Sequence, residues 1–215
     1  MSAKRVGILG SGVVAQQLGR GLIRHGYEVM LGTRDPEKLD AWKKEVGAPA
    51  RVGSFAQAAE YGEFVILATN GGGTETAVGL AGAPSFGTKL VIDATNPLDF
   101  SHGMPPGLLL GTTDSLGERV QRKIPSAKVV KCFNTVGNAR MIDPKFSSGA
   151  PPMMICGNDA AAKKRTDELL RELGWSGALD VGDLQGARWL EAMVPLWVRV
   201  GGVLNTWEHI FQAVR

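Results

Sequence analysis

The sequence predicts an α/β protein of the doubly wound, mostly parallel type, with a small helical part at its C-terminal end. Short apolar runs that fit buried parallel strands alternate with helix-like segments along most of the 215 residues. The first apolar run, residues 6–9, leads directly into a glycine-rich turn and then into an amphipathic segment. This strand–turn–helix order is typical of the dinucleotide-binding unit of Rossmann-type folds.

The glycine-rich turn covers residues 10–15, with the sequence GSGVVA. Gly10 permits a tight turn, and Gly12 has no side chain, so a pyrophosphate can approach the backbone. Ala15 is small enough for the helix to pack closely on the strand. The free N–H groups and the dipole at the start of the helix favour phosphate binding. We therefore expect the pyrophosphate of a dinucleotide to lie against this turn and the start of the helix; a turn that binds nothing is the alternative.

The end of the second strand indicates which dinucleotide is bound. NAD sites usually place an acidic residue about 20 residues after the glycine motif, where it accepts from the ribose hydroxyls. This chain has Thr33 and Arg34 there, and Lys38 follows about one turn later. A guanidinium can pair with a 2′-phosphate and also stack on adenine. We expect Asp35 to cap the helix that begins at Pro36. The sequence therefore predicts NADP(H) rather than NAD(H); the alternative is that Arg34 is only a solvated surface charge.

Polar residues also follow the later strands, where ligands of such sheets bind. The runs 64–68 and 89–93 end in Thr69-Asn70 and in Asn96-Pro97, and a further strand at 128–133 is followed by Asn134. We expect the segment 71–73 to be a loop that contacts the cofactor, with a flexible connection as the alternative. The additional candidate cofactor-binding residues are Gly10, Ala68, Thr69, Asn70, Asn96, Pro97, Asn134, Gly137 and Asn138.

The remaining pattern predicts one Rossmann domain over residues 1–182 and a helical segment over 183–215 that packs on the site and on a dimer interface. In that segment we expect helices interrupted near Pro195 and Gly201. The other expected elements are helices at 36–46, 54–61, 74–81, 115–124 and 159–173, strands at 50–52, 153–156 and 178–181, and an irregular stretch at 99–110.

Composition narrows the class of protein. The net charge of +3 is not clustered, so charge gives no reason to expect a nucleic-acid partner. The three histidines lack metal-ligand spacing. Cys132 and Cys156 lie in apolar runs and are expected to be reduced core residues, as in a cytoplasmic protein. Neither a signal peptide nor a membrane span is expected.

No Ser/His/Asp, Cys/His or paired-carboxylate pattern is evident, so we name no catalytic residue. Hydride transfer needs two aligned rings and exclusion of water rather than a protein nucleophile. The pattern therefore fits hydride exchange between NADP(H) and a second cofactor. Two alternatives stay open: an NADPH-dependent reductase of a small carbonyl or imine, and a non-catalytic NADP(H)-binding redox sensor.

Several segments together resemble the NADPH-dependent reductases of coenzyme F-420, a deazaflavin, and the cytosolic domain of the Steap metalloreductases. The resemblance covers almost the whole chain. Its motifs are GSGVVA, Gly32-Thr33-Arg34 with Lys38, the segments 95–97, 131–136, 153–159 and 180–188, and Glu191, Pro195 and Leu196.

The resemblance implies pyrophosphate binding by residues 11–14 and a 2′-phosphate clamp of Thr33, Arg34 and Lys38. It implies that Thr69, Asn70, Asn96 and residues near Asn138 surround the nicotinamide. The deazaflavin of the family would lie between residues 134–137 and the start of the last helix. Characterised deazaflavin reductases have a His-Thr-Ile-Pro-like sequence where this chain has Asn-Thr-Val-Gly, so FMN or FAD stays open as the second cofactor.

The C-terminal segment is rich in large apolar residues at three- and four-residue spacings. Such a pattern is typical of a core face or a dimer face, and we expect a homodimer packed through this helix. Trp189 and Trp197 could also form a wall of the second-ligand pocket. The expected partners are a small-molecule or cofactor second substrate and a second copy of the chain.

Overall fold

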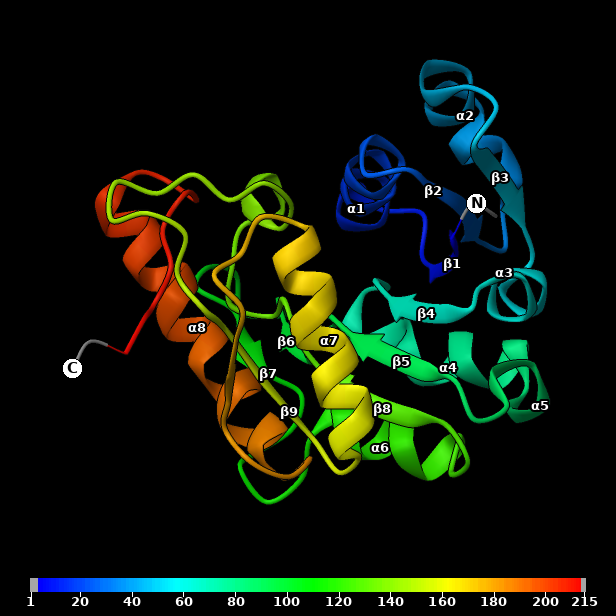
Figure 1. The fold of residues 1–215 in the computed structure, drawn as a ribbon. Helices are drawn as coiled ribbons and strands as arrows, with labels where there is room; N and C mark the ends of the chain where they lie inside the picture. The colour runs from blue at the N-terminus through cyan, green and yellow to red at the C-terminus, as the bar shows by residue number, and fades with distance from the viewer. Residues whose placement is uncertain (1–3, 214–215) are drawn as a thin grey trace.

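The computed structural model describes residues 4–213 and places eight strands in one sheet, in the order β10-β9-β8-β5-β4-β1-β2-β3 (Figure 1). In this order, the neighbouring strands β8, β5, β4, β1, β2 and β3 are all parallel. Strand β9 runs antiparallel to β8, and β10 is parallel to β9. The sheet is therefore the mostly parallel, Rossmann-type sheet that the sequence predicts. Its strands are β1 (Lys4–Leu9), β2 (Tyr27–Gly32), β3 (Ala50–Gly53), β4 (Phe64–Leu67), β5 (Leu90–Asp93), β8 (Lys128–Lys131), β9 (Met153–Gly157) and β10 (Ala178–Asp180).

Helices cover both faces of this sheet. On one face α1, α2 and α7 pack over side chains such as Ile8, and on the other α3 to α6 pack over side chains such as Leu9. The alternation arises because successive residues of a strand point to opposite faces. The helices are α1 (Val13–Arg24), α2 (Asp40–Val46), α3 (Phe55–Tyr61), α4 (Gly71–Ala81), α5 (Ala83–Phe86), α6 (Leu116–Lys123), α7 (Ala160–Glu172) and α8 (Gly186–Leu204).

The C-terminal helix α8 lies across the molecule from β3, at the left of Figure 1 in orange and red. Through Ala187 and Leu190, the start of α8 packs in the same hydrophobic core as Leu9 and helices α3 to α6. The division into domains at residues 182 and 183 stays a prediction. Residues 1–3 of the first predicted domain and 214–215 of the second lie outside the described residues.

Three local expectations were wrong. Residues 71–73 are not a loop, because α4 begins at Gly71 with Asn70 as its cap. The segment from Pro36 begins as a 3-10 helix, Pro36–Leu39, and the Asp35 side chain does not cap it. The last helix is not interrupted at Pro195 or Gly201. Gly201 instead makes room for the indole of Trp207, since a Cβ atom there would lie 2.7 Å from that ring.

Two short elements lie outside the main sheet and its covering helices. A two-stranded hairpin of β6 (Leu98–Asp99) and β7 (Gly107–Leu108) overlaps the stretch 99–110 that was expected to be irregular, and a 3-10 turn covers Asn138–Arg140. Cys132 and Cys156 are both buried and free; they pack in core clusters on opposite faces of the sheet. Within residues 4–213 no helix has the length and apolarity needed to span a bilayer.

Candidate dinucleotide site

Two adjoining cavities form a groove across the carboxyl ends of β2, β1, β4 and β5. The larger has a volume of about 510 Å³ and the smaller about 240 Å³. Both are lined by Gly12, Ala68, Thr69 and Asn70, so they are continuous. The groove lies where the chain reverses its direction of travel across the sheet, between β1 and β4. This switch point is where ligands bind in open α/β sheets.

The glycine-rich turn has the geometry that the sequence argument requires. Gly10 has a φ of +142°, and a Cβ atom there would lie 2.4 Å from the carbonyl oxygen of Ala68. No such constraint applies at Gly12, where a Cβ atom would meet nothing within 4 Å. Gly10 thus serves the fold, whereas Gly12 leaves open space on the side from which a phosphate would approach.

The start of α1 is equipped for an anion. Its N-cap Gly12 supplies no side-chain hydrogen bond, and its first turn holds no acidic residue. The amide N–H groups of that turn therefore have no intrahelical partner and are free to donate. Gln16 fixes the turn by donating from Nε2 to the carbonyl oxygen of Ser11 at 2.9 Å. The arrangement can hold a pyrophosphate through the backbone alone.

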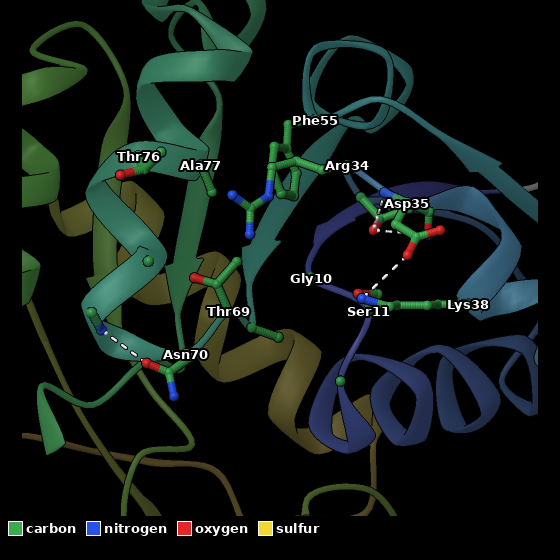
Figure 2. A pocket seen from close by; sticks show the side chains of 15 residues that line it. Gly10, Ser11, Arg34, Asp35, Lys38, Phe55, Thr69, Asn70, Thr76 and Ala77 are labelled. Atoms are coloured by element: carbon green, nitrogen blue, oxygen red, sulfur yellow. Dashed lines mark hydrogen bonds and ion pairs between the residues drawn. The ribbon is translucent and has the colours of Figure 1, made fainter. Parts of the chain in front are cut away.

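The far end of the larger cavity carries the cationic side chains. Figure 2 shows Arg34 reaching into the cavity beside Phe55 and Ala77, which line the same space. None of the ion pairs found among residues 4–213 involves Arg34. A further cavity of about 630 Å³ adjoins it and is lined by Arg34, Phe55 and Leu80. A planar base can therefore lie next to both the guanidinium and apolar surface.

Thr33 and Lys38 are placed differently from the simple clamp expected. The Thr33 hydroxyl accepts from the backbone N–H of Asp35 at 3.1 Å and lies 3.3 Å from the carbonyl oxygen of the same residue. Lys38 pairs with the Asp35 carboxylate at 3.2 Å. Thr33 thus shapes the turn, and Lys38 pairs with the Asp35 carboxylate, which lines the cavity beside Arg34.

The smaller cavity is bordered by the start of α4 and by the end of β5. The Asn70 side chain accepts from the N–H of Gly72 at 3.0 Å and so caps α4. The hydroxyl groups of Thr69 and Thr74 form a hydrogen bond of 2.9 Å, which also joins the end of β4 to α4. Of the described residues that line this cavity, none has a titratable side chain; they are Gly12, Val13, Val14, Ala68, Thr69, Asn70, Gly71, Ala94, Thr95, Asn96, Leu98 and Phe100.

The structure brings most of the sequence-predicted residues to this groove. The larger cavity is lined by Gly10, Ser11, Gly12, Thr33, Arg34, Lys38, Ala68, Thr69 and Asn70, and the smaller adds Val13, Val14 and Asn96. Four predicted residues line neither cavity: Pro97, Asn134, Gly137 and Asn138. Trp189 and Trp197, considered as walls of a second pocket, line neither cavity; Trp189 is 61% exposed, and Trp197 stacks on His209.

A buried ionic cluster was missed by the sequence argument. The Lys131 ammonium lies 3.0 Å from Oδ2 of Asp93 and 2.7 Å from Oε1 of Glu191, and the Lys131 side chain is wholly buried. Burial disfavours the ammonium, but the two carboxylates outweigh it and raise the pKa of Lys131 above its ordinary value of 10.5. The three residues are up to 98 positions apart in the printed sequence, from residue 93 to 191, so spacing could not reveal the cluster.

The comparisons with known proteins agree with this geometry. Residues 5–97 match the family described as NADP oxidoreductase, coenzyme F420-dependent. A crystal structure from Arthrobacter sp. FB24, provisionally named an F420-dependent NADP reductase, is 40% identical, with full coverage of both chains and a TM-score of 0.93. The chain belongs to this family of NADP-dependent oxidoreductases.

Two curated proteins are similar over part of their length. The F420-dependent NADP reductase of Methanocaldococcus jannaschii is 33% identical over 111 residues, which are 51% of this chain and 49% of that protein. Metalloreductase STEAP3 of Rattus norvegicus is 28% identical over 199 residues, which are 91% of this chain and 38% of that protein. The chain thus spans less than half the length of either protein.

Proposed function

We propose that the chain binds NADP(H) in the groove and passes hydride between the nicotinamide and a deazaflavin such as coenzyme F-420, or a flavin. The observation that carries this proposal is the continuity of the groove from Arg34, past the N-terminus of α1, to the apolar cavity at β5. Each part of the groove suits one part of NADP(H). The 2′-phosphate would pair with Arg34 and Lys38, the pyrophosphate with residues 11–14, and the nicotinamide with the smaller cavity.

The lining of the smaller cavity favours a cofactor as the second substrate. Reduction of a carbonyl or an imine needs a proton as well as a hydride, and enzymes usually supply that proton from a positioned side chain. No titratable group among the described lining residues could do so. Hydride transfer to a deazaflavin or flavin also takes up one proton, but the conjugated ring delocalises the negative charge until water supplies that proton, so no protein acid is required. Val13 and Phe100, which are 67% and 51% exposed, offer apolar surface at the cavity mouth.

Two other functions remain as alternatives. A reductase of a small carbonyl or imine would need a proton donor from bulk water or from a second copy of the chain. A non-catalytic NADP(H)-binding sensor would need only the groove. The name of the Arthrobacter relative favours coenzyme F-420 as the acceptor, and the differences at Asn134–Gly137 leave FMN and FAD open.

An acceptor panel tests the proposal. The purified protein is mixed with NADPH and, in turn, coenzyme F-420, FMN, FAD, a ferric chelate and small cyclic imines, and loss of NADPH absorbance is followed. Rapid oxidation with F-420 or a flavin supports the proposal. Turnover only with an imine or carbonyl would favour the reductase, and tight binding of NADPH without turnover would favour the sensor.

A second copy of the chain is the partner that we propose for α8. Trp189, Leu196 and Val203 are 61%, 56% and 80% exposed, and their seven-residue spacing places them on one face of the helix. Exposed apolar stripes of this kind mark interaction surfaces, and a twofold dimer would cover each stripe with its counterpart. Sedimentation velocity should give a dimer that Leu196→Glu converts to a monomer; a monomeric parent protein would contradict this. The cytoplasm is the compartment we propose, since both cysteines are free.

A further inference from the structure

The geometry points to a positioning role for the buried Lys131–Asp93–Glu191 cluster. The cluster fixes the position, relative to helix α8, of Thr95 and Asn96, which line the smaller cavity. This inference rests on the proposed function, because it assumes that the nicotinamide occupies the smaller cavity. The cluster touches neither cavity itself, so its members are positioning residues rather than catalytic ones.

The hydrogen bonds of Lys131 are complete. Its ammonium group has three donors, and these meet Oδ2 of Asp93 at 3.0 Å, Oε1 of Glu191 at 2.7 Å and the carbonyl oxygen of Thr95 at 2.5 Å. One side chain of β8 therefore joins Asp93 at the end of β5, Thr95 two residues further along the chain, and helix α8.

Both carboxylates are equally well satisfied. Asp93 accepts from the N–H and the hydroxyl of Thr95 at 2.9 and 2.6 Å. Glu191 accepts from the N–H groups of Leu116 and Gly117 at 2.9 and 3.1 Å, which are the first two residues of α6. Buried ionisable groups are costly unless each is paired and hydrogen-bonded, and here each one is. Loss of one partner would leave another buried group unpaired, so the cluster fixes the relative positions of the elements that carry it.

The cluster leads directly to the wall of the smaller cavity. Thr95 is bonded to Asp93 and Lys131, and both Thr95 and Asn96 line the cavity. Asn96 donates from Nδ2 to the carbonyl oxygen of Asn134 at 3.1 Å, and Asn134 donates from Nδ2 to the carbonyl oxygen of Leu190 at 2.7 Å. Leu190 precedes Glu191, so the bonds close a ring through β5, β8 and α8.

Backbone conformation at the end of β8 supports the same role. Phe133, which precedes Asn134, has a φ of 61° and is buried. A side-chain-bearing residue adopts this left-handed conformation only where its surroundings enforce it, and such residues cluster at ligand sites. The amide oxygens of Asn96 and Asn134 are buried, and among residues 4–213 they have no hydrogen-bond partner. Both asparagines are thus held by their amino groups, through the ring.

The test compares two halves of one ligand. Adenosine 2′,5′-bisphosphate carries the 2′-phosphate but no nicotinamide, whereas NADPH carries both. In Glu191→Gln, the new amide group would face either a backbone N–H or Lys131, because both oxygens of Glu191 accept hydrogen bonds. We expect adenosine 2′,5′-bisphosphate to bind as in the parent protein. NADPH affinity and the turnover number should each fall about tenfold or more, since a small misplacement of the reacting ring can cost about a hundredfold in rate, and the emission of bound NADPH should change.

The matched control is Glu118→Gln. Glu118 also joins α6 to α8, through Arg188 at 2.6 and 2.8 Å, but it lies outside the ring and both cavities. Glu118→Gln should leave the affinities for both ligands and the turnover number unchanged. Asn134→Ala removes the hydrogen bond to the Leu190 carbonyl and so opens the ring without leaving a buried charge unpaired. If Glu191→Gln does not fold, this variant should show the same result: weaker NADPH binding with unchanged affinity for adenosine 2′,5′-bisphosphate.

Two results would overturn the inference. One is equal weakening of both ligands, which would mean a general structural role. The other is a folded variant in which the ring is broken but NADPH binding, NADPH emission and turnover are unchanged. If the parent protein bound neither ligand, the proposed function itself would be wrong, so the two failures are distinguishable.

Discussion

Gly71 and the carbonyl group of Asn96 pack so closely that a Cβ atom on Gly71 would lie 1.9 Å from the Asn96 oxygen. This contact joins the first turn of α4 to the end of β5, and both residues line the smaller cavity. Glycine at position 71 therefore sets the width of the groove between the two elements.

Gly71→Ala should destabilise the protein and widen the groove. The added methyl group meets backbone, which cannot rotate away, and overpacking of this kind costs about 1–3 kcal/mol. Chemical denaturation measures the loss, and NADPH titration should show weaker binding. The control is Gly79→Ala in the same helix, where the new Cβ atom meets nothing within 4 Å. Gly79→Ala should stabilise the protein by up to about 1 kcal/mol. If Gly79→Ala lowered the free energy of unfolding more than Gly71→Ala, the close contact at Gly71 would be contradicted.

The two glycines of the phosphate turn should separate stability from binding. Gly10→Ala strains a φ of +142° and brings a methyl group against the Ala68 carbonyl, so the free energy of unfolding should fall. Gly12→Ala meets no protein atom within 4 Å and should leave stability nearly unchanged. It should still weaken NADPH about tenfold, or ~1.4 kcal/mol, because the methyl group occupies the phosphate approach. Parallel melting curves and titrations measure both effects; normal NADPH affinity in Gly12→Ala would argue against this phosphate position.

Acid should weaken the junction between α6 and α8. The hydrogen bonds from Arg188 hold the pKa of Glu118 below its ordinary value of 4.5. A depressed folded-state pKa stabilises the protein above the unfolded-state pKa, and the stabilisation is lost as pH falls through the folded-state value. The parent protein should therefore be more stable than Glu118→Gln at pH 7, and the difference should shrink below about pH 4.5. Denaturation series at several pH values measure it; a difference that grows on acidification would contradict the assigned pKa direction.

Several predicted residues that line the groove are placed there by local chemistry. Gly10 and Gly12 lie within one turn, and Arg34 follows two residues after the end of β2. Residues 71–73 were wrongly predicted to be a loop because glycine is a poor helix former. In the structure, the small size of Gly71 is needed next to the Asn96 carbonyl. The C-terminal helix was expected to break at Pro195, yet it continues, since packing of its flanks outweighs one lost hydrogen bond.

The Lys131 cluster lay beyond sequence reasoning for a different reason. Its members come from β5, β8 and α8, and no periodicity relates them. The available signal was weak: a lysine directly after two valines at the end of the strand 128–131, and a glutamate on the apolar side of the last helix. A buried lysine implies buried carboxylates, but the topology was needed to say which ones.

Selection of NADP(H) through Arg34 is tested most directly by the affinities of Arg34→Ala for NADPH and NADH. A charged hydrogen bond of this kind contributes about 1.5–3 kcal/mol, or roughly ten- to a hundredfold in affinity. In Arg34→Ala, the affinity for NADPH should fall by that factor and the affinity for NADH hardly at all. Arg51→Ala, which removes a cation outside both cavities, should change neither affinity. Equal weakening of NADPH and NADH in Arg34→Ala, or no preference for NADPH in the parent protein, would contradict this selection.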